Sequence, residues 1–212
     1  APPLERAVTL NIWASVLIDR GEIVPAIALL EQTLALRQSN GGSNIEIAAT
    51  MNNLAFSFAK VNRLNEAKSM FSKAYALRLE ALGEQNIDTA LTKLNFGRTE
   101  RDLGNFAAAD DAFNEFFITF QGLFPDATAP HPAMIDSLID LGISLRLQDR
   151  VDEAIVVFDR AVAMSLTLDA CGLPLKLSII LTSVMTPQRC CKRPLPCLEV
   201  QNPRWAWTSH RR

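Results

Sequence analysis

Amide side chains recur at related positions along the first two thirds of this chain. Asparagine occupies these positions in three successive segments and an aspartate follows in a fourth; the residues are Asn11, Asn52, Asn53, Asn95 and Asp140. A carboxamide carries both a hydrogen-bond donor and an acceptor, so a row of them on one wall can hold an extended peptide through its backbone. The alternative is that a helix surface merely tolerates these asparagines, and the residues alone leave both hypotheses open.

Basic side chains follow the amides on the same face of the helices that the sequence predicts here. Arg98 comes first, aligned with Phe56, and Lys60, Arg101 and Arg146 lie further along. They predict an electropositive strip, which favours acidic peptides or a C-terminal carboxylate through charge-assisted hydrogen bonds. The alternative is ion pairing within the protein, with Asp102, Asp136 or Asp140 as partners. The candidate binding surface comprises Asn11, Asn52, Asn53, Phe56, Lys60, Asn95, Arg98, Arg101, Asp140 and Arg146.

The sequence contains no group of residues typical of catalysis. His131 lies between two prolines, which makes it a loop residue. The adjacent Asp110 and Asp111 point about 100° apart on a helix, so we expect a solvated helix face and not an acid–base pair. Glycine-rich phosphate loops are absent, and the four cysteines, all after residue 170, lack the paired spacing of a zinc site. We therefore expect no enzyme activity, no cofactor and no metal ion.

The elements that position these side chains repeat along the chain. A turn residue is followed five positions later by alanine, and after four more by a large apolar residue. The turn residues are Gly21, Asn62, Gly104 and Asp149; the alanines are Ala26, Ala67, Ala109 and Ala154; the large residues are Leu30, Phe71, Phe113 and Phe158. The alanines are 41, 42 and 45 residues apart, and a fixed period in this range indicates a solenoid of repeated units.

Each repeated position has a physical reason. Gly enters the left-handed conformation freely, and Asn and Asp enter it more easily than most residues, so these positions predict tight turns between helices. Alanine suits a close crossing of two helices, because a larger side chain would push their axes apart. Each unit is thus predicted to be a helix, a tight turn and an antiparallel helix, and the units stack. A large–small pair marks each first helix: Trp13-Ala14, Leu54-Ala55, Phe96-Gly97 and Leu141-Gly142.

This pattern resembles the tetratricopeptide repeat over about residues 7–168. Two units depart from it at Thr33 and Phe116, where a small residue is usual, and the third also at Glu100, where an aromatic is usual. The resemblance implies an all-α, right-handed superhelical solenoid of four antiparallel helix pairs. The second and fourth units fit best, through Leu54, Ala55, Phe58, Ala67, Phe71 and Ala74 and through Leu138, Leu141, Gly142, Ala154, Phe158 and Ala161.

The repeat looks like the kinesin-light-chain type of about 42 residues, since its period exceeds the common 34. The run Asn52-Asn53-Leu54-Ala55 is similar to that type. The resemblance implies that the asparagine before the leucine contacts peptide: Asn53 and Asn95 match, Ile12 departs, and Asp140 matches in part. The chaperone-binding carboxylate clamp of other tetratricopeptide repeats is not expected, because only Arg98 fits it.

Composition favours a soluble globular protein with an acidic body. The 212 residues are 49% hydrophobic and 21% charged. Residues 1–169 hold 14 Lys+Arg and 22 Asp+Glu, a net charge of −8, whereas residues 170–212 have a net charge of +6. An acidic body repels phosphate, so nucleic acid is not expected as a partner. No secretory signal opens the sequence, and the apolar stretch 173–185 is shorter than the ~20 residues of a membrane span, so a cytoplasmic setting is expected.

We expect two parts in the chain. Residues 1–185 form the repeat domain, with repeats at about 7–45, 46–87, 88–131 and 132–169 and a closing helix at 175–185. Residues 186–212 form a basic, Pro- and Cys-rich tail with three open interpretations. It is a disordered tail, a basic arm that binds nucleic acid or an acidic partner, or an out-of-frame or unspliced end.

The predicted function is non-enzymatic: a scaffold that holds a protein or peptide ligand, acidic by preference, in the concave groove of the solenoid. The alternative is a regulatory or sensor array that forms part of a larger signalling protein, such as a kinase or a nucleotide-binding regulator. A membrane is not expected as a partner, and the sequence does not determine the oligomeric state.

Overall fold

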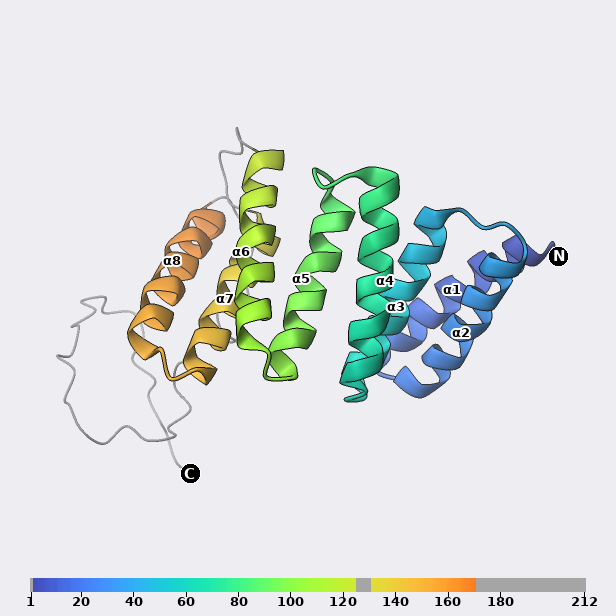
Figure 1. Cartoon of the computed structure of the whole chain (residues 1–212), viewed down its shortest axis with the longest axis horizontal. Coiled ribbons are helices and arrows are strands. Elements are labelled where there is room, and N and C mark those ends of the chain that lie inside the picture. The colour runs from blue at the N-terminus through green and yellow to red at the C-terminus, as the bar shows by residue number, and fades with distance from the viewer. Residues whose placement is uncertain (1, 125–130, 171–212) are drawn as a thin grey trace, which may run out of the picture.

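Eight α-helices make up the described part of the chain. The computed structural model describes residues 2–124 and 131–170, and no strand occurs in these two ranges. The predicted closing helix and tail lie outside the described residues. The helices follow one another across the molecule in chain order (Figure 1). They are α1 (Pro3–Asp19), α2 (Ile23–Ser39), α3 (Asn44–Lys60), α4 (Leu64–Leu82), α5 (Ile87–Asp102), α6 (Phe106–Leu123), α7 (Pro132–Leu147) and α8 (Val151–Ala170).

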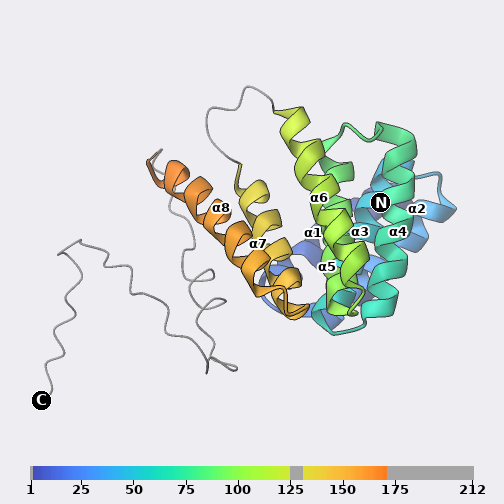
Figure 2. The ribbon, with the colours of Figure 1, turned by 60° about the vertical axis from the view of Figure 1, so that its left-hand side comes forward.

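The helices pack as four antiparallel hairpins stacked side by side, as Figures 1 and 2 show from two directions. Hairpins 1 to 4 are the pairs α1–α2, α3–α4, α5–α6 and α7–α8, and each second helix packs against the first helix of the next hairpin. The first helices α1, α3, α5 and α7 also contact one another across the stack, so they form its inner side. The prediction of an all-α solenoid is confirmed. No helix of the described ranges is long and apolar enough to cross a membrane.

A residue in the left-handed conformation follows the first helix of every hairpin. In hairpin 2 the N–H of Asn62 donates to the carbonyl oxygen of Ala59 at 3.0 Å, and the N–H of Arg63 donates to that of Phe58 at 2.9 Å. This Schellman motif satisfies carbonyl groups that a helix end leaves open, and the other three turns repeat it. The predicted turn residues are confirmed, with φ of 78° at Gly21, 62° at Asn62, 84° at Gly104 and 64° at Asp149.

The two helices of a hairpin approach each other closely where they cross, as hairpins 3 and 4 show. The four predicted alanines of the second helices are buried, as are the large residues four positions later. A Cβ atom added to Gly142 would lie 2.7 Å from Cε1 of Phe158. A Cβ atom on Gly97 would lie 2.9 Å from both Cβ of Ala112 and Cε1 of Phe113. Carbon atoms do not pack this closely, so the spacing of these hairpins depends on the missing side chain.

A buried arginine joins the hairpins at two of the three junctions. Arg37 near the end of α2 and Arg78 of α4 occupy equivalent positions 41 residues apart, and both are less than a tenth exposed. Burial lowers the pKa of Arg78, and the nearby Asp88 carboxylate opposes that shift. Nη1 of each arginine donates to a backbone oxygen and a threonine hydroxyl of the next helix. For Arg37 the acceptors are the backbone oxygen of Glu46 and Oγ1 of Thr50. For Arg78 they are the backbone oxygen of Asp88 and Oγ1 of Thr92.

The third junction uses aromatic rings. Phe120 of α6 occupies the position of the two arginines, and its ring centroid lies 5.3 Å from Phe116, 4.9 Å from Phe124 and 4.8 Å from His131. His131 also caps α7, because its Nδ1 accepts a hydrogen bond from the N–H of Ala133 at 3.1 Å. His131 thus lies just before α7, as predicted, and it also packs against the preceding hairpin.

Adding a methyl group at the two glycines of the helix crossings should destabilise the array. We expect Gly97→Ala and Gly142→Ala each to lower the free energy of unfolding by about 1–3 kcal/mol, because the new Cβ overpacks the crossing. In the matched control Gly122→Ala, at an exposed position of α6, the new Cβ meets Oε1 of Gln85 at 3.7 Å. That control should leave the free energy of unfolding unchanged or raise it by up to about 1 kcal/mol, because alanine favours a helix more than glycine does. Urea denaturation followed by circular dichroism measures all three; an equal loss in the control would contradict the crossing as the cause.

The turn after α3 gives a second prediction. Because Asn62 has a φ of 62°, Asn62→Gly should preserve or slightly raise the thermal midpoint, whereas Asn62→Val should lower the free energy of unfolding by about 1–2 kcal/mol. Thermal unfolding of both variants beside the unmodified chain checks this. Equal midpoints for the two variants would mean that the left-handed conformation is not needed there.

Candidate functional site

The predicted binding residues lie on the first helices, which form the inner side of the stack. The three candidates on α5 and Asp140 of α7 form one network of hydrogen bonds and ion pairs, whereas Phe56 and Lys60 of α3 contact each other separately. The assignment is Asn11 on α1; Asn52, Asn53, Phe56 and Lys60 on α3; Asn95, Arg98 and Arg101 on α5; and Asp140 and Arg146 on α7.

Asp140 joins two arginines of the preceding hairpin. Nε of Arg98 donates to one carboxylate oxygen at 2.6 Å and Nη1 of Arg101 donates to the other at 2.7 Å. Nη1 of Arg98 also donates to Oδ1 of Asn95 at 3.1 Å, and Nε of Arg101 donates to Asp102 at 3.0 Å. Burial alone would lower the pKa of Arg101, but the charges and hydrogen bonds of Asp140 and Asp102 raise it. Asp140 is therefore a buried link between hairpins 3 and 4.

These ion pairs neutralise most of the expected electropositive strip. Arg98 and Arg101 face two carboxylates, so the pairing alternative applies to both arginines. Arg146 and Asp136 also take part in side-chain interactions. The inner side thus offers hydrogen-bond donors held in place by acidic partners, and the excess of positive charge there is small.

Phe56 and Lys60 form a separate contact on α3. The Phe56 side chain is 36% exposed, and Nζ of Lys60 lies 5.0 Å from the centroid of its ring. An ammonium group over an aromatic face is attracted by the negative charge density of the ring. The pair therefore presents an apolar surface and a positive charge at the level of the helix where α5 presents Arg98.

The asparagines fall into two groups. All four are half-buried residues of the first helices, and they differ in the burial of the side-chain oxygen. Oδ1 of Asn11 and of Asn52 is buried and accepts no hydrogen bond from any described residue. The counterpart of Asn52 in hairpin 3 is Leu94, a core residue. Asn11 and Asn52 accordingly lie nearer to the packed junctions, and Asn53 and Asn95 are better placed to reach a ligand.

The expectation of a solvated face at Asp110 and Asp111 is wrong for Asp110. Its carboxylate accepts hydrogen bonds from Oγ of Ser144 at 2.5 Å and Nε2 of Gln148 at 2.8 Å, and it lies 3.4 Å from Nη1 of Arg150. Asp110 therefore connects α6 to hairpin 4, and only Asp111 is exposed. Within the described ranges, no group of three or more His, Cys, Asp or Glu side chains could hold a metal ion.

Glu100 accounts for the departure of the third unit from the repeat pattern. Its side chain is buried where Phe58 stands in hairpin 2, and it pairs with Nζ of Lys68 at 2.8 Å and Nδ2 of Asn105 at 2.7 Å. Lys68 in turn replaces the apolar Ile27 of hairpin 1. An acidic residue at one core position of the repeat and a basic residue at another indicate an ion pair, and this signal was available in the sequence.

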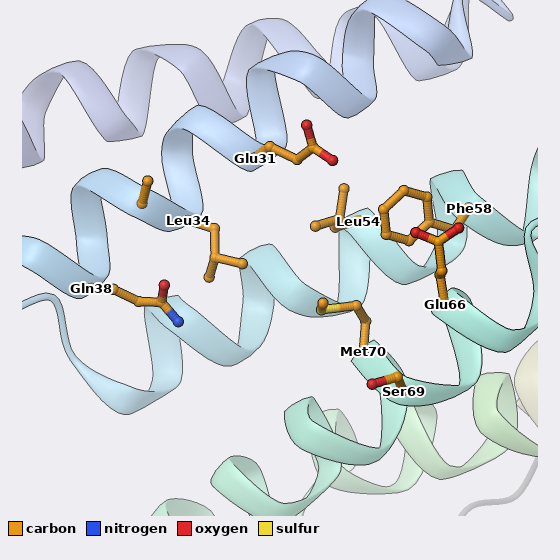
Figure 3. Close-up of a pocket in the computed structure, with 9 residues that line it drawn as sticks. Glu31, Leu34, Gln38, Leu54, Phe58, Glu66, Ser69 and Met70 are labelled. Atoms are coloured by element: carbon orange, nitrogen blue, oxygen red, sulfur yellow. The ribbon is translucent and has the colours of Figure 1, made fainter.

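Clefts lie on the side of the second helices, which sequence reasoning did not consider. The cleft between α2 and α4 has a volume of about 310 Å³ and is lined by Leu54 and Phe58 of α3, with Glu31 and Glu66 from the flanking helices (Figure 3). Clefts at equivalent places between α4 and α6 and between α6 and α8 measure about 470 and 380 Å³. They are shallow spaces between stacked hairpins and hold no assembled group of reactive side chains.

Solved structures with this fold include proteins of the kinesin-light-chain type. BtubC (BKLC) from P. vanneervenii is 18% identical, with a TM-score of 0.70, over 89% of this chain and 70% of that protein. A putative kinesin light chain with nearly identical TPR-like repeats from Podosopora anserina is 18% identical, with a TM-score of 0.66, over 86% of this chain and 83% of the other. Aspartyl phosphate phosphatase F from Bacillus subtilis is 15% identical, with a TM-score of 0.69, over 86% of this chain and 45% of that enzyme. No curated protein sequence gives a significant match.

The tetratricopeptide repeat profile matches residues 5–79 and, overlapping them, residues 46–115. The two matches together span residues 5–115, which is more than half of the 212-residue chain. With four stacked hairpins, left-handed turns and alanines at the helix crossings, the chain belongs to the tetratricopeptide repeat family, and its fold is similar to that of solved kinesin-light-chain repeats.

Proposed function

We propose that this chain is a non-enzymatic scaffold of the cytoplasm that binds an extended peptide or partner segment along the inner side, across α3, α5 and α7. Proteins with this fold generally mediate contacts between proteins. The first helices bring polar and aromatic side chains from successive hairpins to one wall, at intervals set by the repeat. A segment that crosses three first helices would meet these side chains in turn.

The observation that carries the proposal is the fixed position of Arg98. Its Nε is held by Asp140 and its Nη1 by Asn95, yet the side chain remains 35% exposed. Nη2 makes no hydrogen bond with any described residue, so its N–H groups are available to a ligand oxygen. A guanidinium that is already ordered loses little conformational freedom on binding, which favours recognition of a peptide carbonyl or carboxylate.

The neighbouring helix supplies complementary chemistry. Phe56 offers an exposed ring for an apolar side chain, and Lys60 beside it offers a positive charge. Asn53 and Asn95 each supply a carboxamide for backbone groups. Because acidic residues offset Arg98 and Arg101, we expect backbone hydrogen bonds to dominate affinity and acidic ligand residues to add to it mainly through Lys60. The alternative of a regulatory array within a larger signalling protein stays a prediction.

Removing the two carboxamides should weaken ligand binding. A phage-displayed library of random linear peptides, selected on the immobilised full chain, supplies ligands without knowledge of the natural partner. For a selected peptide, we expect Asn53→Ala with Asn95→Ala to weaken binding by roughly tenfold or more, the equivalent of one or two lost hydrogen bonds. Fluorescence anisotropy with labelled peptide measures the dissociation constant.

The matched control is Asn65→Ala with Asn114→Ala, which removes two exposed asparagines of the second helices. Circular dichroism confirms that both double variants are folded. Loss of binding in the control with retention in the Asn53 and Asn95 variant would place the site among the second helices and overturn the proposal. Failure of the library to yield any saturable ligand would argue equally against peptide recognition.

A further inference from the structure

The outward face of α1 is apolar and open to solvent. Trp13 and Val16 are 56% and 50% exposed. Their counterparts on α3 are Leu54 and Ser57, which are 2% and 0% exposed. Those counterparts are covered because α2 of the preceding hairpin packs against α3. On α1, the positions that the other first helices use for stacking are therefore uncovered among the described residues.

The same face carries a polar arrangement that elsewhere receives an arginine. Oγ1 of Thr9 donates to the backbone oxygen of Glu5 at 3.1 Å. Thr50 and Thr92 make the equivalent bond, at 3.0 and 2.8 Å, to the residue four positions earlier. At those two junctions the hydroxyl and the carbonyl oxygen both accept from Nη1 of an arginine. No arginine of the described residues donates to Thr9 or to the Glu5 oxygen.

An acidic residue lies four positions before the threonine at both junctions that contain the arginine. Glu46 and Asp88 stand four positions before the threonines that bind Arg37 and Arg78, and Nη2 of Arg37 lies 3.9 Å from Oε1 of Glu46. At the third junction, where Phe120 replaces the arginine, Ala133 replaces the acid. Glu5 with Thr9 on α1 therefore repeats the arrangement that receives an arginine on α3 and α5.

We propose that the outward face of α1 is a docking surface for an α-helix of a partner protein that resembles α2 and α4. The apolar stripe of that helix covers Trp13 and Val16, and an arginine near its C-terminal end donates to Thr9 and to the Glu5 oxygen. A second copy of this chain fits poorly. Its Arg37 and Arg78 are already engaged, and its last described helix, α8, carries Ser165 at the equivalent position.

A tethered copy of α2 tests this recognition. Residues 2–42 are duplicated directly before Pro2 of the full chain, which preserves the 41-residue spacing between hairpins 1 and 2. Tethering gives a high effective concentration, so a modest intrinsic affinity does not hide docking. Trp205→Phe, Trp207→Phe and, in the added copy, Trp13→Phe leave the original Trp13 as the reporter.

The duplicated chain is compared with the unduplicated chain, in which Trp205 and Trp207 are likewise Phe. We expect the thermal midpoint to rise by roughly 5 °C and iodide quenching of Trp13 to fall several-fold, because a stacked repeat adds an interface. In the duplicated chain, two changes should each reverse part of the rise in thermal midpoint. They are Arg37→Leu in the added copy and Thr9→Val in the original α1. The two together should reverse less than the sum of the two single effects, as expected for groups in contact.

The remaining outcomes overturn the proposal in different ways. Unchanged quenching of Trp13 in a duplicated chain that circular dichroism shows to be folded means that the face does not accept such a helix. Docking that is insensitive to Arg37→Leu and Thr9→Val removes the arginine from the recognition. Sedimentation equilibrium of the unmodified chain, with Trp13→Asp as the comparison, tests the second copy: self-association lost in that variant would make this face an interface between copies.

Discussion

The spacing of two helices in each hairpin is the constraint on which the rest of the structure depends. In hairpins 3 and 4 the first helix has a glycine where the second helix places a phenylalanine ring, and a single added carbon would lie within 3 Å of that ring. The left-handed turn at the end of the first helix delivers the second helix to this contact. Once the spacing is set, successive first helices come into contact and their side chains share one wall.

The junctions between hairpins are less uniform than the hairpins. Two use a buried arginine that satisfies a carbonyl and a hydroxyl of the next helix, and the third uses a cluster of phenylalanines and a histidine. A buried cation is costly unless its hydrogen bonds are made, so its acceptors have to change with it. The threonine hydroxyl supplies one of these acceptors, and the acidic side chain adds an opposite charge near each arginine. Where Phe120 replaces the arginine, Ala133 replaces the acid.

Electrostatic pairing also limits what the inner side can recognise. Asp140 binds two arginines of the neighbouring hairpin, which strengthens the stack and leaves little net charge for an acidic ligand. The same pairing fixes the orientation of Arg98, and an oriented donor contributes to specificity even where the net charge is near zero. In the function proposed here, stability of the junction and recognition of the peptide depend on the same side chains.

The sequence by itself determined the repeat. Turn residues, alanines and large–small pairs lie at fixed spacing, and local backbone and packing rules suffice to place the helices and turns. It also placed the candidate residues on the first helices, because the register within a helix follows from the repeat. Only the tertiary structure decided which side chains pair: Arg98 with Asp140, Glu100 with Lys68, and Asp110 with Ser144. Those partners lie on different hairpins, and their approach depends on how far each hairpin rotates and shifts against the next, which no spacing within one helix specifies.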